Sequence, residues 1–194
     1  MTRPLPLRLV ALAVLILAGC LKNNATHDPI EPVMMALTNT TDHVVYLDTL
    51  PGGDILGAGL RLQQKGASAY LIPAPSCAER LCSEACEVVG CTDAPSVREL
   101  LPNATYSFAW MPYEFSPGQD TCPGQACLAA ARAPEGRYLM SACYGTDLKM
   151  VGTPQKSPTD PLVISGASVS SAICTKPFEV GLPGYDVRYQ LYIP

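Results

Sequence analysis

The sequence has little charge, and it lacks the basic excess that a nucleic-acid-binding surface needs. Charged residues make up 15% of its 194 residues, against roughly 25% in a typical soluble domain. It contains 13 basic and 17 acidic side chains, so a binding site for the phosphate backbone of a nucleic acid is not expected. The 19 prolines and 15 glycines favour a turn-rich, mostly β protein over a helical bundle.

Catalytic motifs are also missing from the sequence. There is no P-loop, no G-x-G-x-x-G fingerprint and no G-x-S-x-G nucleophile elbow. His27 lies in a polar segment near the N-terminus, which leaves His43, beside Asp42, for a Ser-His-Asp or Cys-His unit. We expect His43 to be a surface residue next to a turn, and we assign no catalytic residue. A hydrolase would need His43 to meet a serine or a carboxylate in a deep cleft.

The sequence has one long apolar run, Leu9 to Ala18, and its ten residues are too few for a membrane-spanning helix, which needs about 20. Arg3 and Arg8 precede this run, and the small residues Ala18 and Gly19 follow it. A basic start, an apolar core and small residues at the end are typical of a secretory signal peptide.

The sequence Leu17-Ala18-Gly19-Cys20 resembles the lipobox of bacterial lipoproteins at all four positions. The resemblance implies that residues 1–19 are a signal peptide cleaved between Gly19 and Cys20, and that Cys20 carries acyl chains such as palmitate. Several acyl chains hold a protein at a membrane essentially permanently. In this family an Asp after the cysteine commonly retains the protein at the inner membrane, so Leu21 indicates the outer membrane.

Export changes the charge balance of the chain. Removing the signal peptide also removes Arg3 and Arg8, so 11 basic side chains face 17 acidic ones, and 11 − 17 gives a mature net charge of −6. Residues 20–32 are polar and contain prolines, which predicts a tether between the lipid and the domain. Residues 33–194 are predicted to form a single domain.

Short segments with apolar residues at every second position predict an all-β domain. The turn cluster 39–42 separates two of them, which predicts a first hairpin from residues 33–37 and 43–48; residues 60–62 and 67–72 predict a second. Further strands are expected at 106–111, 136–144, 167–175 and 186–193, and residues 152–161 are expected to form an exposed loop. We expect an antiparallel, immunoglobulin-like β-sandwich of about seven to nine strands. A β-barrel is the alternative.

Two local features refine this fold. Residues 78–89, AERLCSEACEVV, form the one candidate helix. Ala133 to Tyr138 resembles the turn into a late strand of immunoglobulin-like domains, where a tyrosine fixes the corner through its hydroxyl group. Cys143 follows Tyr138 by five residues, not by the two of true immunoglobulin domains, so kinship to antibody-type domains does not follow.

The eight cysteines after Cys20 form an even set, which in an oxidising compartment predicts up to four disulfides. These residues are Cys77, Cys82, Cys86, Cys91, Cys122, Cys127, Cys143 and Cys174. We favour a local Cys122–Cys127 bond across the turn at Pro123-Gly124, and a bond between strands from Cys143 to Cys174.

The first four cysteines of this set also allow another interpretation. Four thiolates within fifteen residues are the ligands of a structural zinc site. The spacings of four residues lie at the edge of the usual zinc pattern, and exported thiols tend to be bridged, so we expect disulfides and no metal. Methionines with His43 as copper ligands are a further alternative, against which core filling explains most of them more simply.

The sequence as a whole predicts a non-enzymatic lipoprotein of the cell envelope. It resembles cysteine-rich bacterial lipoproteins with no assigned activity, at the level of layout only. We expect a disulfide-braced domain on the periplasmic side or the surface, held by its acyl chains, that binds another envelope protein or an extracellular ligand. An inhibitor of proteases or other hydrolases, displaying residues 77–91 or 116–127 as its loop, is the alternative. A metal-binding envelope protein is the weaker alternative.

Overall fold

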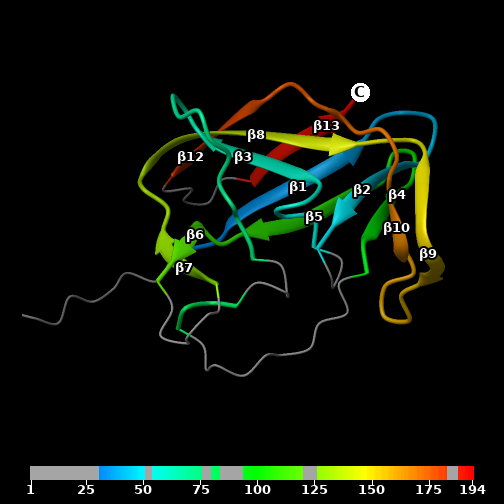
Figure 1. The fold of residues 1–194 in the computed structure, drawn as a ribbon. Coiled ribbons are helices and arrows are strands. Elements are labelled where there is room, and N and C mark those ends of the chain that lie inside the picture. Colours follow the sequence, from blue (N-terminus) through cyan, green and yellow to red (C-terminus); the bar gives the residue numbers. More distant parts are fainter. Residues whose placement is uncertain (1–30, 51–53, 76–79, 84–93, 120–125, 183–187) are drawn as a thin grey trace, which may run out of the picture. The chain divides into compact units, whose positions relative to one another are not determined.

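The computed structural model describes residues 31–50, 54–75, 80–83, 94–119, 126–182 and 188–194, and these residues contain strands and no helix (Figure 1). Residues 31–194 form one compact unit. The strands are β1 (Val33–Asn39), β2 (Val45–Thr49), β3 (Leu60–Gln64), β4 (Ser96–Leu100), β5 (Thr105–Trp110), β6 (Tyr113–Gly118), β7 (Cys127–Arg132), β8 (Gly136–Tyr144), β9 (Leu148–Lys156), β10 (Val163–Val169), β11 (Ile173–Cys174), β12 (Phe178–Leu182) and β13 (Arg188–Ile193).

The first sheet has the strand order β13-β1-β5. Val33, Met35 and Leu37 of β1 are buried, as the predicted alternation requires. β5 runs antiparallel to β1, with Met35 opposite Phe108. β13 runs parallel to β1, so the expectation of a wholly antiparallel sandwich is wrong for this one pair, which joins the two ends of the domain.

The second sheet is built around β8, with β3 along one side and β12 and then β11 along the other. The third sheet has the order β2-β4-β10-β9. An isolated antiparallel bridge between Tyr46 and Gly145 joins β2 to the end of β8. The backbone nitrogen of Tyr46 donates to the oxygen of Gly145 at 2.8 Å, so the second and third sheets meet at this bridge.

One apolar core contains buried residues from all three of these sheets. At its centre Trp110 of β5 meets Tyr138 of β8 edge to face, with ring centroids 5.4 Å apart, and both side chains are fully buried. Every described sheet has two free ends. The domain is therefore a β-sandwich, as predicted, and not the closed barrel of the alternative.

The predicted tyrosine corner is present. The hydroxyl group of Tyr138 donates to the carbonyl oxygen of Pro134 at 2.6 Å, which fixes the turn just before β8. Burial, with a smaller contribution from the nearby Glu114 carboxylate, raises the pKa of Tyr138. The phenol therefore stays protonated as a donor.

The predicted first hairpin is wrong in its pairing. β1 and β2 have the expected positions, but β1 belongs to the first sheet and β2 to the third. Asn39 turns the chain between them: its buried side-chain amide donates to the carbonyl oxygens of His43 at 2.8 Å and Leu100 at 2.9 Å. His43 lies in the connection from β1 to β2, and Leu100 ends β4 just before the connection to β5. Asn39 therefore holds together two places where the chain passes between the first and third sheets.

The other strand predictions are confirmed with smaller changes, but the predicted count of about seven to nine strands is too low, because the structure describes thirteen. The second hairpin is reduced to a bridge between Leu62 and Leu71 beyond β3. The strand expected at 167–175 is divided between β10 and β11. The expected loop 152–161 is wrong in its first half, because β9 continues to Lys156 as an exposed edge strand. Pro154 is tolerated there because an edge strand leaves one side of its backbone unpaired.

The predicted helix at 78–89 is wrong where the structure describes it. Leu81 forms a parallel bridge with Leu128, and Cys82 and Ser83 lie in a turn. Residues 78–79 and 84–89 lie outside the described residues. Pairing with β7 satisfies the backbone of residues 80–82 in place of helical hydrogen bonds.

Candidate interaction site

Two disulfides connect the four cysteines that the structure describes. Cys143 of β8 is bonded to Cys174 of β11, as predicted, and the two residues lie directly opposite each other in the strand register. Cys82 is bonded to Cys127. Four further predicted disulfide cysteines, and the predicted lipidation and cleavage positions, lie outside the described residues: Cys77, Cys86, Cys91, Cys122, Gly19 and Cys20.

The predicted Cys122–Cys127 bond is wrong, because Cys127 pairs with Cys82. The segment at 80–83 lies beside β7: the backbone nitrogen of Cys82 donates to Leu128 at 2.9 Å, and that of Leu128 donates to Arg80 at 2.8 Å. These bonds bring the Cα atoms of Cys82 and Cys127 to 5.0 Å, within the usual range for a disulfide. A contact between residues 45 positions apart leaves no local signal in the sequence.

Gly118 makes room for this disulfide. It lies opposite Cys127 in the β6–β7 register, and a Cβ atom at Gly118 would be 2.4 Å from the sulfur of Cys82. Residues 80–83, β6 and β7 together form a unit that we call the cystine platform. The described parts of both predicted presenting loops, 77–91 and 116–127, belong to this one unit.

The cystine platform is fixed on one side and open on the other. Phe115 of β6 is half-buried, and its backbone nitrogen donates to Ile72 at 3.1 Å. Ser116, Pro117, Ala130 and Ala131 are exposed. Small exposed side chains on a braced hairpin offer shape and backbone groups to a partner.

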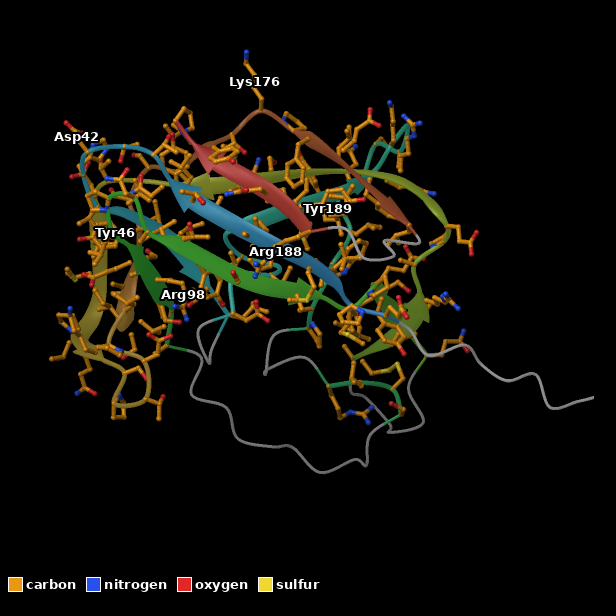
Figure 2. The ribbon with its side chains drawn as sticks, turned by 180° about the vertical axis from the view of Figure 1, so that it is seen from behind. Asp42, Tyr46, Arg98, Lys176, Arg188 and Tyr189 are labelled. Carbon is orange, nitrogen blue, oxygen red and sulfur yellow. A yellow bond between two sulfur atoms is a disulfide. The ribbon has the colours of Figure 1, made fainter. Side chains whose placement is uncertain are left out.

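His43, predicted to be a surface residue next to a turn, lies exposed on the connection between β1 and β2. Its Nδ1 atom is 2.9 Å from the Oδ1 atom of Asp42, and the two side chains are 52% and 100% exposed. The hydrogen bond from His43 holds the pKa of Asp42 below its ordinary value. Among the residues that the structure describes, Asp42 is the side chain to which the His43 ring is hydrogen-bonded. Asp42 lies at the surface (Figure 2).

The candidate ligands of the zinc alternative are not grouped in the described part of the chain. No group of three or more His, Cys, Asp or Glu side chains with the geometry of a metal site occurs there. The disulfide of Cys82 also uses one of the four thiolates that the zinc alternative requires. Of the methionines, Met35 and Met140 are fully buried in the core, whereas Met34, Met111 and Met150 are exposed.

One buried polar cluster was missed by the sequence reasoning. Arg98 of β4 has its guanidinium group over the ring of Tyr106 of β5, 4.1 Å from the centroid, and donates to Asp160 at 2.6 Å. The Arg98 side chain is only 9% exposed and lies between the first and third sheets (Figure 2). The hydrogen bond from Arg98 holds the pKa of Asp160 below its ordinary value, and burial raises the pKa of Tyr106.

This cluster connects the first and third sheets. Arg98 is engaged on one side by a ring and on the other by a carboxylate, and Asp160 also accepts the backbone nitrogen of Leu162 at 3.1 Å. A buried cation that is paired in this way fixes the geometry of its neighbours. The segment 96–100 shows no apolar alternation that would have marked Arg98 as inward-facing.

No family model, no curated protein and no solved structure matches the chain. In the ranges described above, none of the residues belongs to a helix with the length and apolar character needed to cross a membrane.

Proposed function

We propose that the chain is a non-enzymatic, lipid-anchored protein of the cell envelope that binds another envelope protein or an extracellular ligand through the cystine platform. The observation that carries this proposal is the pair of disulfides, Cys82–Cys127 and Cys143–Cys174. Disulfides persist in oxidising compartments, outside the cytosol. An exported chain with the motif Leu17-Ala18-Gly19-Cys20 then fits a lipoprotein acylated at Cys20.

The anchor leaves the domain free for binding. Acyl chains on Cys20 attach the protein to the membrane, and Leu21 in the next position favours the outer membrane. The polar tether of residues 20–32 separates the lipid from the sandwich. The domain therefore needs no apolar membrane-binding surface of its own.

The cystine platform is the contact region best suited to a protein partner. It joins two segments far apart in the sequence through a disulfide and a short ladder of backbone bonds. Its exposed residues are therefore held in one arrangement, which lowers the entropy lost on binding. Rigid, exposed segments on a β-sandwich scaffold are typical positions for recognition.

Replacement of Cys20 tests the anchor. In the variant Cys20→Ala we expect the protein to leave the membrane fraction and to lose the acyl mass. A variant that stays bound to membranes with an unchanged mass would contradict the lipid anchor.

Site-specific photocrosslinking in cells tests the contact region. A photoreactive residue replaces Ala130 on the platform in one variant and Ala109, an exposed residue on the outer face of β5, in the matched control. We expect a specific crosslinked species from position 130 and none from position 109. Crosslinks from the control alone would place the contact on the first sheet.

A second candidate function is the inhibition of a hydrolase. The observation that favours it is the fixing of β6 and β7 by the Cys82–Cys127 bond beside Gly118, since a braced hairpin resists distortion in an active-site cleft. A panel of extracellular proteases tests this function. Inhibition that is lost in the double variant Cys82→Ala and Cys127→Ala supports it, and no inhibition of any protease removes it.

A further inference from the structure

The second sheet turns one side to the core and the other away from it, where Arg137 is exposed, Leu139 is half-buried and Ser141 is buried. On β8, Tyr138 and Met140 are buried in the core, so Arg137, Leu139 and Ser141 lie on the outer side. In the register of β3, Arg61 lies opposite Ser141, and the backbone nitrogen of Lys65 donates to Arg137 at 2.8 Å.

This outer side and the segment just before β12 carry four cations from different parts of the chain. We call this surface the cationic face, and its members are Arg61 and Lys65 of the β3 segment, Arg137 of β8 and Lys176 before β12. All four are exposed, and Lys176 projects away from the strands (Figure 2).

One carboxylate lies within the cationic face. Glu179 of β12 accepts Arg137 at 3.1 Å and also binds Lys65. These two cations hold the pKa of Glu179 below its ordinary value, the hydrogen bond from Lys65 being the largest cause. With four cations and one anion the face has a net charge of 4 − 1 = +3, and Glu135 stands at its rim, directly before β8.

The rest of the mature chain has the opposite charge. The mature net charge is −6, so the residues outside the cationic face sum to −6 − 3 = −9. The outer side of the first sheet carries less charge than the cationic face: across β13, β1 and β5, Arg188 is the one charged residue. Four of the eleven basic residues of the mature chain therefore belong to one face of an acidic protein.

The geometry points to an anionic lipid surface as the occupant of the cationic face. We infer that Arg61, Lys65, Arg137 and Lys176 bind the anionic headgroups of the membrane that holds the Cys20 anchor. Cations spread over several strands of a sheet match an extended layer of negative charge better than a single anion. This inference rests on the lipid anchor of the proposed function.

Because of the tether, a weak attraction between the cationic face and the membrane is sufficient to bring them into contact. The twelve residues Leu21 to Pro32 span at most about 42 Å when fully extended, so the domain stays close to the bilayer and its effective concentration there is high. Each Lys or Arg near an anionic surface raises the partition by about fivefold. Contact through the cationic face would turn the domain toward the membrane.

Vesicle binding by the mature chain with Cys20→Ala tests the inference without the acyl chains. We expect the protein to sediment with vesicles of phosphatidylcholine that contain phosphatidylglycerol, to bind pure phosphatidylcholine vesicles much more weakly, and to be released by salt. Absence of binding to the anionic vesicles, or equal binding to both, would overturn the inference.

Two sets of substitutions locate the binding surface. Replacing all four cations of the cationic face by Gln is expected to lower the anionic-vesicle partition at least about tenfold. Replacing Arg132, Lys149, Lys156 and Arg188 by Gln changes the net charge equally and is expected to keep most of the binding. A control set that loses as much binding as the first would show that no particular face is used.

A single substitution provides a test in the opposite direction. Glu179→Gln raises the net charge of the cationic face from +3 to +4 and is expected to tighten binding by about fivefold; unchanged or weaker binding would count against the inference. Binding to soluble polyglutamate but not to vesicles would assign the face to an acidic protein partner and overturn the lipid assignment. The acyl mass at Cys20 is measured separately, so a failed anchor and a failed lipid contact give different results.

Discussion

Two of the contacts between the first sheet of the sandwich and its opposite layer differ in chemistry. Toward the second sheet, Trp110 packs on Tyr138 inside the apolar core. Toward the third sheet, the guanidinium group of Arg98 lies on Tyr106 and binds Asp160. Apolar packing gains free energy from the area removed from water, whereas a buried ion pair gains little over its desolvation cost and mainly fixes geometry.

This difference has a consequence for pH. The contact between Trp110 and Tyr138 involves no group that titrates in the acidic range. The contact of Arg98 depends on an ionised Asp160, whose pKa is lowered by that partner. We therefore expect the Arg98 contact to weaken first as the pH falls.

The largest effect is expected from the apolar contact. Trp110→Ala removes a fully buried side chain and is expected to lower the free energy of unfolding by about 3–5 kcal/mol, measured by urea denaturation. The control is Met111→Ala, at an exposed neighbouring position, with an expected change within about 0.5 kcal/mol. A loss below about 1 kcal/mol for Trp110→Ala would show that the packing of Trp110 contributes little to the free energy of unfolding.

A smaller loss is expected from the polar contact. Arg98→Ala removes the packing on Tyr106 and leaves Asp160 without its cation, but Asp160 stays partly hydrated because its side chain is 38% exposed. We expect a loss of about 2 kcal/mol in the free energy of unfolding. Arg188→Ala, an exposed arginine bonded to Ser107, is the matched control and should change it by less than about 0.5 kcal/mol. Equal effects of the two substitutions would contradict a special role for Arg98.

The tyrosine corner separates packing from hydrogen bonding at the apolar contact. Tyr138→Phe keeps the ring on Trp110 and removes the hydroxyl group that donates to Pro134. We expect a loss of about 1 kcal/mol in thermal or urea unfolding. An unchanged stability would mean that the backbone fixes the turn before β8 without the hydrogen bond from Tyr138.

The smallest effect is expected from Asp160→Asn, and it should depend on pH. Because the folded-state pKa of Asp160 lies below its ordinary value of 3.8, the ionised form stabilises the fold above that value and this contribution is lost as the pH falls through the lowered pKa. We expect the wild-type protein to exceed the variant by at most about 1 kcal/mol at neutral pH, with the difference shrinking below pH 3.8. A difference that is constant with pH would contradict the role of the Asp160 charge.

The sequence predicted the strands of the apolar contact because their pattern is local. Alternating apolar residues located β1, β5, β8 and β13, and the turn before Tyr138 was identified from its composition. The same alternation does not say which strands pair, so the sequence placed β1 and β2 in one hairpin although they lie in different sheets. β9 showed no alternation because nearly all of its side chains are exposed.

The polar and covalent contacts could not be predicted in the same way. Arg98 reads as an ordinary surface charge until β4 places it against Tyr106 and Asp160. Cys127 has a closer neighbour in sequence, Cys122, but backbone pairing of residues 80–82 with β7 brings Cys82 to it. Both contacts depend on the fold as a whole, whereas the lipobox and its expected lipid are read from residues 17–20 alone.

The most direct test of an exported, lipid-anchored and disulfide-braced protein is the intact mass of the protein extracted from membranes, with peptide mapping before and after reduction. We expect a chain that begins at acylated Cys20 and yields linked peptides containing Cys82 with Cys127 and Cys143 with Cys174. A chain that begins at Met1, with these four cysteines as free thiols, would contradict the account.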